Sequence, residues 1–293
     1  MYELIQAGER TWYIDCPAKM GLYTPDGTHA YLIDSGNDKE AAKKALRHIE
    51  TLGLTLAGIA NTHSNADHAG GNAFLQQKTG CKIICTALEN AFMRFTELEP
   101  SFLYGGYPCK ELRIKFLMAP PCKPDAVPED ALPEGLTCIR LPGHFFDMVG
   151  YQTADGVFFA ADSLFGEHTL NKYHLAFLYD VRAFFQTLDL LGTLKATLFV
   201  PSHAPACTDL APLIEANRAK VLGIIGVILA ICKTPLMFED VMKQVLDHFC
   251  LTLDFNQYVL VGSTLRSYLS YLHDEGRLDC VFEQNRLLWK TKA

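Results

Sequence analysis

The sequence predicts a layered α/β protein with a smaller helical unit at its C-terminal end. Three observations lead to this prediction. Strand-like and helix-like segments alternate over the first 90 residues, further strand-like runs fill residues 136–203, and the pattern turns helical from about residue 211. Alternation of this kind is typical of sheets covered by helices, because each element must bury an apolar face against another.

The first elements follow from turn residues and periodicity. Residues 11–15 and 29–34 are rich in β-branched and aromatic side chains, and the turn sequence TPDG between them predicts paired strands. Residues 38–52 place small and aliphatic side chains at helical spacing, with a glycine after the last turn. We then expect a short buried strand at 56–60, the polar loop NTHSNADHAGGN, a helix to about Lys78 and the strand CKIICT.

Residues 86–135 depart from this alternation. They are dense in Pro, Gly and aromatic residues, and proline disfavours both helix interiors and central strands. We therefore expect an irregular insertion that covers part of the surface as a lid. After it, the sequence predicts strands in LTCIRLP, VGYQTA, GVFFAAD and TLFVPSH, with an amphipathic helix near 181–191 before the last of them.

The chain divides on this basis into two domains. Residues 1–210 form the layered domain, and residues 211–293 form a helical linker and a compact C-terminal unit. In that unit we expect helices at 238–249 and 263–275, followed by a hairpin around the sequence EQN.

Charge and hydropathy narrow the classes of function. The chain has 293 residues, a net charge of −7 and 49% hydrophobic residues, which excludes a disordered tail protein. Nucleic-acid wrapping and attachment to anionic lipid both need a concentrated positive field, so neither is expected. The longest apolar run has 12 residues, short of the roughly 20 that a membrane-spanning helix needs. Ten scattered cysteines without a CxxC motif, and an N-terminus without an apolar signal segment, favour a cytoplasmic protein.

Histidine and aspartate side chains follow the ends of several predicted strands. They are His63, Asp67, His68, His144, Asp162 and His203. A rigid sheet that delivers such groups from the same ends of its strands predicts a metal site, and imidazole with carboxylate suits zinc, iron or manganese. Gly70 and Gly71 predict that residues 63–68 curl as a loop, which allows two neighbouring metals with a bridging hydroxide.

These motifs resemble the metallo-β-lactamase-fold superfamily, of the glyoxalase II and β-lactamase-like protein 2 type. The family's HxHxDH motif, downstream histidine, bridging aspartate and final histidine match His63-x-Asn65-x-Asp67-His68, His144, Asp162 and His203. The segments YLIDSG and HAGGN match as well. The resemblance covers about residues 1–210 and implies an αββα sandwich.

The resemblance also implies the roles of these residues. His63 and His144 would hold a first metal, and Asp162 would bridge to a second metal held by Asp67, His68 and His203. Asp34 looks like the family's aspartate that orients the site. The implied cofactor is one or two divalent metal ions, zinc first, with manganese or iron as alternatives.

Asn65 stands where the family has its second histidine. An amide carbonyl is a harder and weaker ligand than imidazole, which favours manganese or iron over zinc or leaves that metal loosely held. Three outcomes stay open: a dinuclear site with Asn65 or water as a ligand, a mononuclear site, or a degenerate site without catalysis.

Three further side chains are candidate substrate contacts at the rim of the site, namely Tyr104, His168 and His174. The alternative for the histidines is a solvent-facing loop, and for Tyr104 a small core under the lid.

The last 80 residues resemble the winged-helix-like tail of some lactamase-like hydrolases, on the sequence STLRSYLSYLHDEGRL and the hairpin after it. From residue 235 onward six Lys and Arg stand against eight Asp and Glu. The positive footprint of a nucleic-acid surface is missing, so we favour packing or homodimer formation.

Together these features predict a metal-dependent hydrolase. A metal-bound hydroxide would attack a small-molecule ester, thioester, amide or phosphoester, with Asp67 as the catalytic residue that orients the water. Two alternatives stay open, a binding or regulatory protein with a degenerate site on the same fold, and an iron-dependent oxidoreductase.

Overall fold

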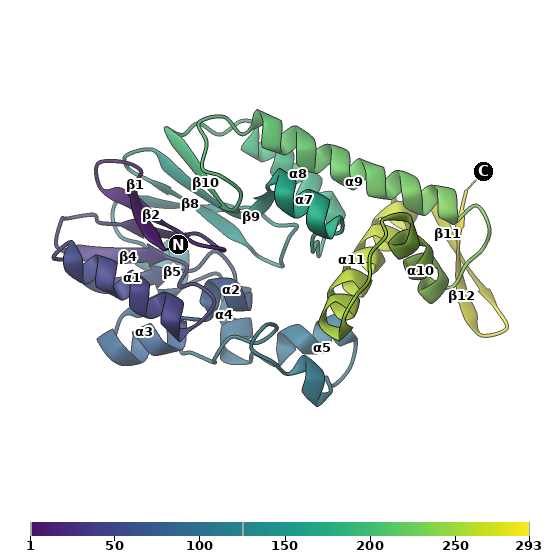
Figure 1. Ribbon diagram of the computed structural model, residues 1–293, viewed down its shortest axis with the longest axis horizontal. Helices are drawn as coiled ribbons and strands as arrows, with labels where there is room; N and C mark the ends of the chain where they lie inside the picture. The colour runs from purple at the N-terminus through teal and green to yellow at the C-terminus, as the bar shows by residue number, and fades with distance from the viewer. Residues whose placement is uncertain (1, 125, 293) are drawn as a thin grey trace.

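The computed structural model describes residues 2–124 and 126–292 of the chain. Two β-sheets packed face to face form the larger part of the molecule, at the left in Figure 1. The first sheet has the strand order β1-β2-β3-β4-β5-β6. Its strands are β1 (Glu3–Gln6), β2 (Thr11–Asp15), β3 (Met20–Tyr23), β4 (His29–Ile33), β5 (Thr55–Ala60) and β6 (Lys82–Ile84). Strands β4, β5 and β6 run parallel, because helices connect them.

The second sheet has the strand order β10-β9-β8-β7. Its strands are β7 (Leu136–Arg140), β8 (Val149–Thr153), β9 (Val157–Phe165) and β10 (Leu198–His203). Strands β9 and β10 are parallel, and helices α7 (Glu167–Tyr173) and α8 (Val181–Leu191) lie between them in sequence. The sequence predicted all four of these strands and α8.

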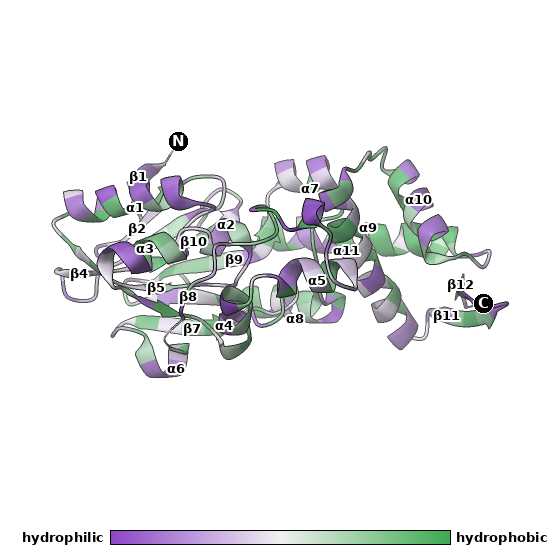
Figure 2. Ribbon diagram, turned by 90° about the horizontal axis from the view of Figure 1, so that it is seen from below, coloured by the Kyte–Doolittle hydropathy of each residue, from purple (hydrophilic) through white to green (hydrophobic). Residues whose placement is uncertain are grey.

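Helices cover both outer faces of the paired sheets. On the first sheet, α1 (Lys39–Thr51) and α3 (Asn72–Thr79) bury aliphatic side chains against the strands. On the second sheet, α8 and α9 (Ala211–Ile231) do the same. A separate apolar cluster lies between the sheets, where Ile33 and Ala60 meet Tyr151 and Phe159. This is the expected αββα sandwich. Figure 2 shows the contrast between the hydrophobic strand β9 and the hydrophilic segments of α1 and α7.

The segment between β5 and α3 contains a short helix, so the expectation of a loop over 63–68 is only partly right. One turn, α2 (Ala66–Ala69), carries Asp67 and His68. The two glycines after it allow close packing rather than merely breaking a helix. A Cβ atom at Gly70 would lie 2.4 Å from the backbone of Asn37, and one at Gly71 would lie 2.4 Å from the carbonyl oxygen of Ser35. The end of α2 is therefore pressed against the segment after β4.

The expectation of an irregular insertion over 86–135 is partly wrong. The described part of this segment contains α4 (Ala87–Arg94), α5 (Leu98–Tyr104), the 3₁₀ turn η1 (Lys110–Leu112) and α6 (Pro128–Ala131). Proline did not prevent these helices because Pro100 and Pro128 lie in first turns, where a backbone N–H has no partner within the helix.

The C-terminal unit consists of α10 (Phe238–His248), α11 (Phe255–Asp274) and the hairpin of β11 (Leu278–Glu283) and β12 (Arg286–Thr291). Helix α11 starts earlier than the expected residue 263, because Asp254 and Gln257 form a capping box at its N-terminus. The 21-residue helix α9 carries the chain to this unit, and α11 runs back toward α5 (Figure 1). Within the described residues, no helix combines the length and apolar character needed to cross a membrane.

One buried cluster joins the second sheet, α8, α9 and the C-terminal helices, so the two predicted domains should unfold together. Trp12 in β2 and Trp289 in β12 are the two tryptophans of the chain. Their fluorescence reports on the unfolding of the sandwich and of the C-terminal unit, respectively. We expect the single-tryptophan variants Trp12→Phe and Trp289→Phe to show the same urea midpoint by fluorescence. In both backgrounds, Leu265→Ala should lower the free energy of unfolding by about 2–5 kcal/mol, because Leu265 is fully buried in this cluster.

The control for this prediction is Leu222→Ala, which shortens a leucine that is 51% exposed on α9 and should change stability little. A transition of Trp289 that shifts alone, while that of Trp12 stays in place, would show two independent folding units instead.

Candidate metal centre

The strand ends and the turn α2 bring six histidine and aspartate side chains together. His63 follows β5, Asp67 and His68 lie on α2, His144 follows β7, Asp162 lies in β9, and His203 ends β10. They form two groups, His63 with His144 and Asp162, and Asp67 with His68 and His203. In each group the possible ligand atoms all lie within 4.8 Å of one another. The resemblance implied the same separation of His63 and His144 from Asp67, His68 and His203, with Asp162 as a bridge, and these ligand roles stay a prediction.

Asp162 does not end its strand, as the sequence suggested, because β9 continues to Phe165. The preceding residue, Ala161, has a φ of 51°, and the pairing of β9 with β10 shifts register at this point. Left-handed backbone at a residue other than glycine is costly and often marks a functional site. The Asp162 carboxylate, directly after this irregularity, lies 3.2 Å from both His68 Nε2 and His203 Nε2.

Each of the four histidines contacts a polar group through its Nδ1 atom. The partners are Thr62 Oγ1 for His63 at 3.0 Å, Asp34 Oδ2 for His68 at 2.8 Å, the Phe177 carbonyl for His144 at 2.9 Å, and the Pro17 carbonyl for His203 at 2.8 Å. An Nδ1–H that donates to such an acceptor leaves the Nε2 lone pair for a metal and fixes the ring. In that tautomer, each of the four rings offers its Nε2 atom to a metal ion.

Several atoms at the centre lack hydrogen-bond partners. Among the described residues, His63 Nε2, His68 Nε2 and Asp162 Oδ1 are buried atoms without a hydrogen bond, and the last two are an ion pair at 3.2 Å. Buried polar atoms without a partner are costly in a protein interior. A divalent cation accepts nitrogen and carboxylate donors of this kind, so the residues present fit a metal.

The charges of the centre are strongly perturbed by burial and by one another. Burial and the neighbouring His68 hold the pKa of His63 well below its usual value, and burial also lowers the pKa of His144. His68 differs, because the carboxylates of Asp162, Asp67 and Asp34 outweigh burial and raise its pKa well above the usual value. The same carboxylates, Asp162 first and then Asp67, outweigh burial and raise the pKa of His203 to about 10. The carboxylates of the centre thus favour positive charge at both histidines, and a bound metal ion would supply that charge instead of protons.

Asp34 organises the centre from the end of β4. Its backbone is left-handed, with a φ of 63°. Its carboxylate accepts hydrogen bonds from Thr62 N and Thr62 Oγ1, both at 2.8 Å, in addition to its contact with His68. Because Thr62 also contacts His63, one carboxylate orients a histidine of each group. The resemblance implied an orienting role for Asp34, which stays a prediction.

Comparison with known protein families identifies the family of this chain. A family model described as the Metallo-beta-lactamase superfamily matches residues 14–203. The chain belongs to this superfamily. Solved structures agree with the fold at low sequence identity. A metallo-beta-lactamase family protein from Thermus thermophilus is 20% identical with a TM-score of 0.70, over 96% of this chain and 98% of that chain. A beta-lactamase domain protein from Burkholderia ambifaria is 17% identical with a TM-score of 0.73, over 99% and 94%.

Curated relatives match a shorter stretch. A hydroxyacylglutathione hydrolase from Thiobacillus denitrificans is 28% identical over 141 residues, which is 48% of this chain and 44% of the relative. A protein of the same name from Bradyrhizobium sp. (strain ORS 278) is 30% identical over 129 residues, or 44% and 42%. The matches thus span less than half the length of these relatives.

Asn65, where the superfamily motif has its second histidine, lies beside the first group. Its Oδ1 is 3.2 Å from His144 Nε2, and its Nδ2 donates to Glu99 Oε1 at 2.8 Å. Glu99 lies on α5 and is 7% exposed, and burial raises its pKa well above the usual value. Sequence reasoning missed this residue because it lies in the segment expected to be irregular.

Glu89 on α4 was missed for the same reason. Its carboxylate accepts hydrogen bonds from Ser64 N, Ser64 Oγ and Asp147 N at 2.7–3.0 Å, and burial raises its pKa to about 7. The signal was present in the sequence, because Glu89 shares the helical spacing of the buried Phe92 and Met93. Glu89 ties the loop that follows His63 to the loop that follows His144.

The centre opens into a cleft of about 350 Å³. Its lining comes from the sandwich, from the insertion and from α11, and comprises Asn37, Asn65, Ala66, Asp67, Glu99, Lys115, Phe116, Leu117, His144, Asp162, Phe177 and Leu260. Lys115 is the cation in this set, and the outer lining is largely apolar.

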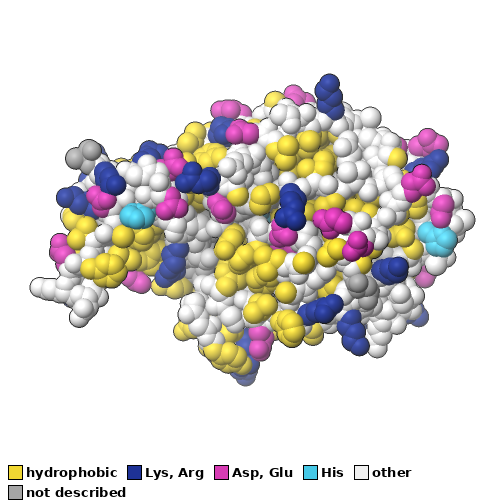
Figure 3. All heavy atoms as spheres, turned by 180° about the vertical axis from the view of Figure 1, so that it is seen from behind, with side chains coloured by type: hydrophobic (Ala, Val, Ile, Leu, Met, Phe, Trp, Pro, Cys, Tyr) yellow, Lys and Arg dark blue, Asp and Glu magenta, His cyan; other side chains and the backbone are white. Residues whose placement is uncertain are grey.

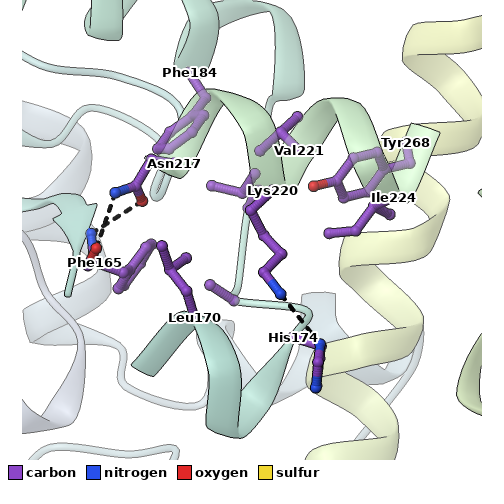
Figure 4. A pocket seen from close by; sticks show the side chains of 11 residues that line it. Phe165, Leu170, His174, Phe184, Asn217, Lys220, Val221, Ile224 and Tyr268 are labelled. Carbon is purple, nitrogen blue, oxygen red and sulfur yellow. Dashed lines mark hydrogen bonds between the residues drawn. The ribbon is translucent and has the colours of Figure 1, made fainter. Parts of the chain in front are cut away.

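The three predicted rim residues are not among those that line the cleft. His168 is exposed on α7, and the ring of Tyr104 lies 6.5 Å from that of Phe255. His174 contacts Lys220 Nζ at 3.1 Å (Figure 4). Its ring also stacks on that of Phe249. The cavity beside it holds about 10 Å³, room for a water molecule and not for a substrate. The geometry therefore gives no support to their assignment as substrate contacts.

Asp34 provides a test of how the centre is oriented. We expect Asp34→Asn to weaken divalent metal binding by about 10–100-fold, because the amide removes the charged acceptor of His68 while tolerating the left-handed backbone. Competition with a chelator dye measures the change. Asp38→Asn, which alters the exposed cap of α1, should bind metal as the parent protein does. Unchanged metal affinity in Asp34→Asn would contradict the orienting role.

Proposed function

We propose that the protein is a metal-dependent hydrolase of small molecules. The observation that supports this most directly is the pair of ligand groups, with their Nε2 atoms free of hydrogen bonds or shared with carboxylates, at the base of an open cleft. His63, His144 and Asp162 would hold one divalent ion, and Asp67, His68 and His203 the other. Bound divalent ions lower the pKa of water to near neutrality and stabilise the negative charge that develops on the attacked group.

Side chains in the cleft would orient the attacking water and exclude bulk water. Asp67 lines the cleft, and its Oδ2 lies 3.3 Å from His203 Nε2 and 3.7 Å from His68 Nε2. A carboxylate in this place can accept a proton from a water in the cleft and fix its direction of attack. The apolar side chains Phe116, Phe177 and Leu260 would exclude bulk water around the substrate.

The substrate we propose first is a thioester or ester of modest size. The cleft volume is within the range of small-molecule sites. The curated relatives bear the name hydroxyacylglutathione hydrolase, which makes hydroxyacyl thioesters the first compounds to assay. Lys115 gives the cleft a cation for an anionic substituent.

Zinc is the first metal to test, with manganese and iron next because Asn65 offers oxygen in place of nitrogen. Elemental analysis separates this proposal from a degenerate binding protein, which would hold no metal after reconstitution. An iron-dependent oxidoreductase would hold iron and absorb visible light, so the absorption spectrum and a hydrolysis assay distinguish it from an iron-containing hydrolase. The ligand group Asp67, His68 and His203 is complete, which favours the hydrolase.

We further propose that the protein works in the cytoplasm. Several of its cysteines, among them Cys16, Cys85 and Cys232, are thiols buried in the core and outside any disulfide. Buried thiols of this kind are typical of a reducing compartment. The expected homodimer stays a prediction.

Removal of single ligands tests the hydrolase directly. We expect Asp162→Ala and His68→Ala to lower thioesterase activity by more than about a hundredfold, since loss of a ligand should exceed the loss caused by removing a residue that only orients one. Metal content measured on the same samples should fall with activity. His48→Ala should leave both unchanged, because His48 contacts the Tyr2 carbonyl on the outer face of α1. Equal losses in all three variants would refute the assignment.

A further inference from the structure

The carboxylate of Glu99 is buried beside the one position where this chain departs from its family motif. It is 7% exposed and accepts a hydrogen bond from Asn65 Nδ2 at 2.8 Å. Within residues 2–124 and 126–292, no Lys, Arg or His side chain forms an ion pair with it. A buried carboxyl group without a cationic partner is costly in its ionised form, and a divalent ion held beside Asn65 would supply the positive charge that this form needs.

Glu99 decides which end of the Asn65 amide faces the centre. The two ends of an amide have nearly the same shape, and hydrogen bonds alone distinguish them. Because a carboxylate oxygen accepts, Asn65 turns its Nδ2 toward Glu99 and its Oδ1 toward His144 Nε2, 3.2 Å away. The amide oxygen therefore faces the nitrogen that belongs to the first ligand group.

The position of Glu99 is itself fixed by packing. Leu103, one turn along α5, lies in a small buried cluster with Leu112 and Leu117 of the insertion and Val259 of α11. Asn65 is fixed as well, because its backbone carbonyl accepts the amides of His68 and Ala69 at 2.9 Å and so begins α2. Both members of the pair are held by rigid elements, which is what a ligand site requires.

We propose that Glu99 and Asn65 act as a unit that replaces the family's second histidine, with Glu99 as a positioning residue that presents Asn65 Oδ1 as the third protein ligand of the first metal. The proposal rests on the metal centre of the proposed function. The hydrogen bond to the carboxylate polarises the amide and strengthens its oxygen as a donor, as carboxylates do for ligating histidines. The first site becomes an oxygen-richer site for a divalent cation, with manganese and iron favoured relative to an all-imidazole site.

The test measures metal binding rather than activity. Metal-free protein is titrated with Zn²⁺ and with Mn²⁺ against a chelator dye, and the ions per chain are counted by elemental analysis. The variants are Glu99→Leu, which removes the acceptor, and Glu99→Gln, which keeps the shape but accepts either orientation of Asn65. Wild type should bind two ions. The weaker ion should bind about 100-fold more weakly in Glu99→Leu and about 10-fold more weakly in Glu99→Gln, while the other ion is unchanged.

Glu97→Gln is the matched control. Glu97 precedes the same helix, is exposed, and lies 3.8 Å from Arg113, so its variant should bind both ions as wild type does. The metal-free Glu99 variants should melt no lower than wild type, because they bury no unpaired charge.

A rescue variant separates ligand positioning from a merely structural role of Glu99. An imidazole at position 65 needs no carboxylate to present a donor atom, so Asn65→His combined with Glu99→Leu should bind two Zn²⁺ ions again. Two ions with unchanged affinity in both Glu99 variants, or failure of this rescue, would overturn the inference and leave the hydrolase proposal intact. Wild type that binds one ion would also overturn it, and wild type that binds none would overturn both proposals.

Discussion

The geometry of the candidate metal centre depends on the hydrogen bonds of the Asp34 carboxylate. It lies at the end of β4 in left-handed backbone and accepts hydrogen bonds from the backbone and side chain of Thr62, just beyond β5. The same carboxylate contacts His68 Nδ1, and the Thr62 hydroxyl contacts His63 Nδ1. Asp34 therefore orients His68 directly and His63 through Thr62. The glycines after α2 let that turn approach closely enough for the contact to form. The positions of the strand ends thereby fix the directions in which the histidine nitrogen atoms point.

The insertion and the C-terminal unit serve the same centre from the other side. Helix α11 packs on α5 through Val259, and α5 carries Glu99 to Asn65. Leu260, the next residue of α11, lines the cleft. Segments far apart in sequence therefore meet at the cleft beside the candidate metal ligands. The similarity of fold to the two solved structures likewise extends over 96% and 99% of this chain and so includes the C-terminal unit.

Local signals predicted most of the sandwich, and long-range contacts account for part of what was missed. Helix α1 was predictable because its apolar spacing and its Asp38 cap are local, and the ligand grouping followed from motif order. Glu99 was not predictable in the same way, because its burial depends on α11 packing on α5. The rim assignment of His174 assumed that residues after the bridging aspartate face the cleft, yet packing turns this side chain toward α9. The start of α11 was misplaced because its capping box was overlooked.

The packing of α11 also bears on whether the C-terminal unit presents a helix to nucleic acid. A recognition helix must keep one face free for a groove. One face of α11 lies in the main core through Leu265, and its N-terminal part packs on the insertion through Val259. Polar contacts add to this packing, since Ser267 Oγ donates to the Tyr179 carbonyl at 2.7 Å and Glu275 pairs with Arg182, while Arg266, Ser270 and Asp274 stay exposed on the opposite side. On the face shown in Figure 3, Lys and Arg are interspersed with Asp and Glu rather than gathered into a basic surface. Helix α11 thus packs on the core and on the insertion and adds Leu260 to the lining of the cleft, as a structural role of the unit would require, and that role stays a prediction.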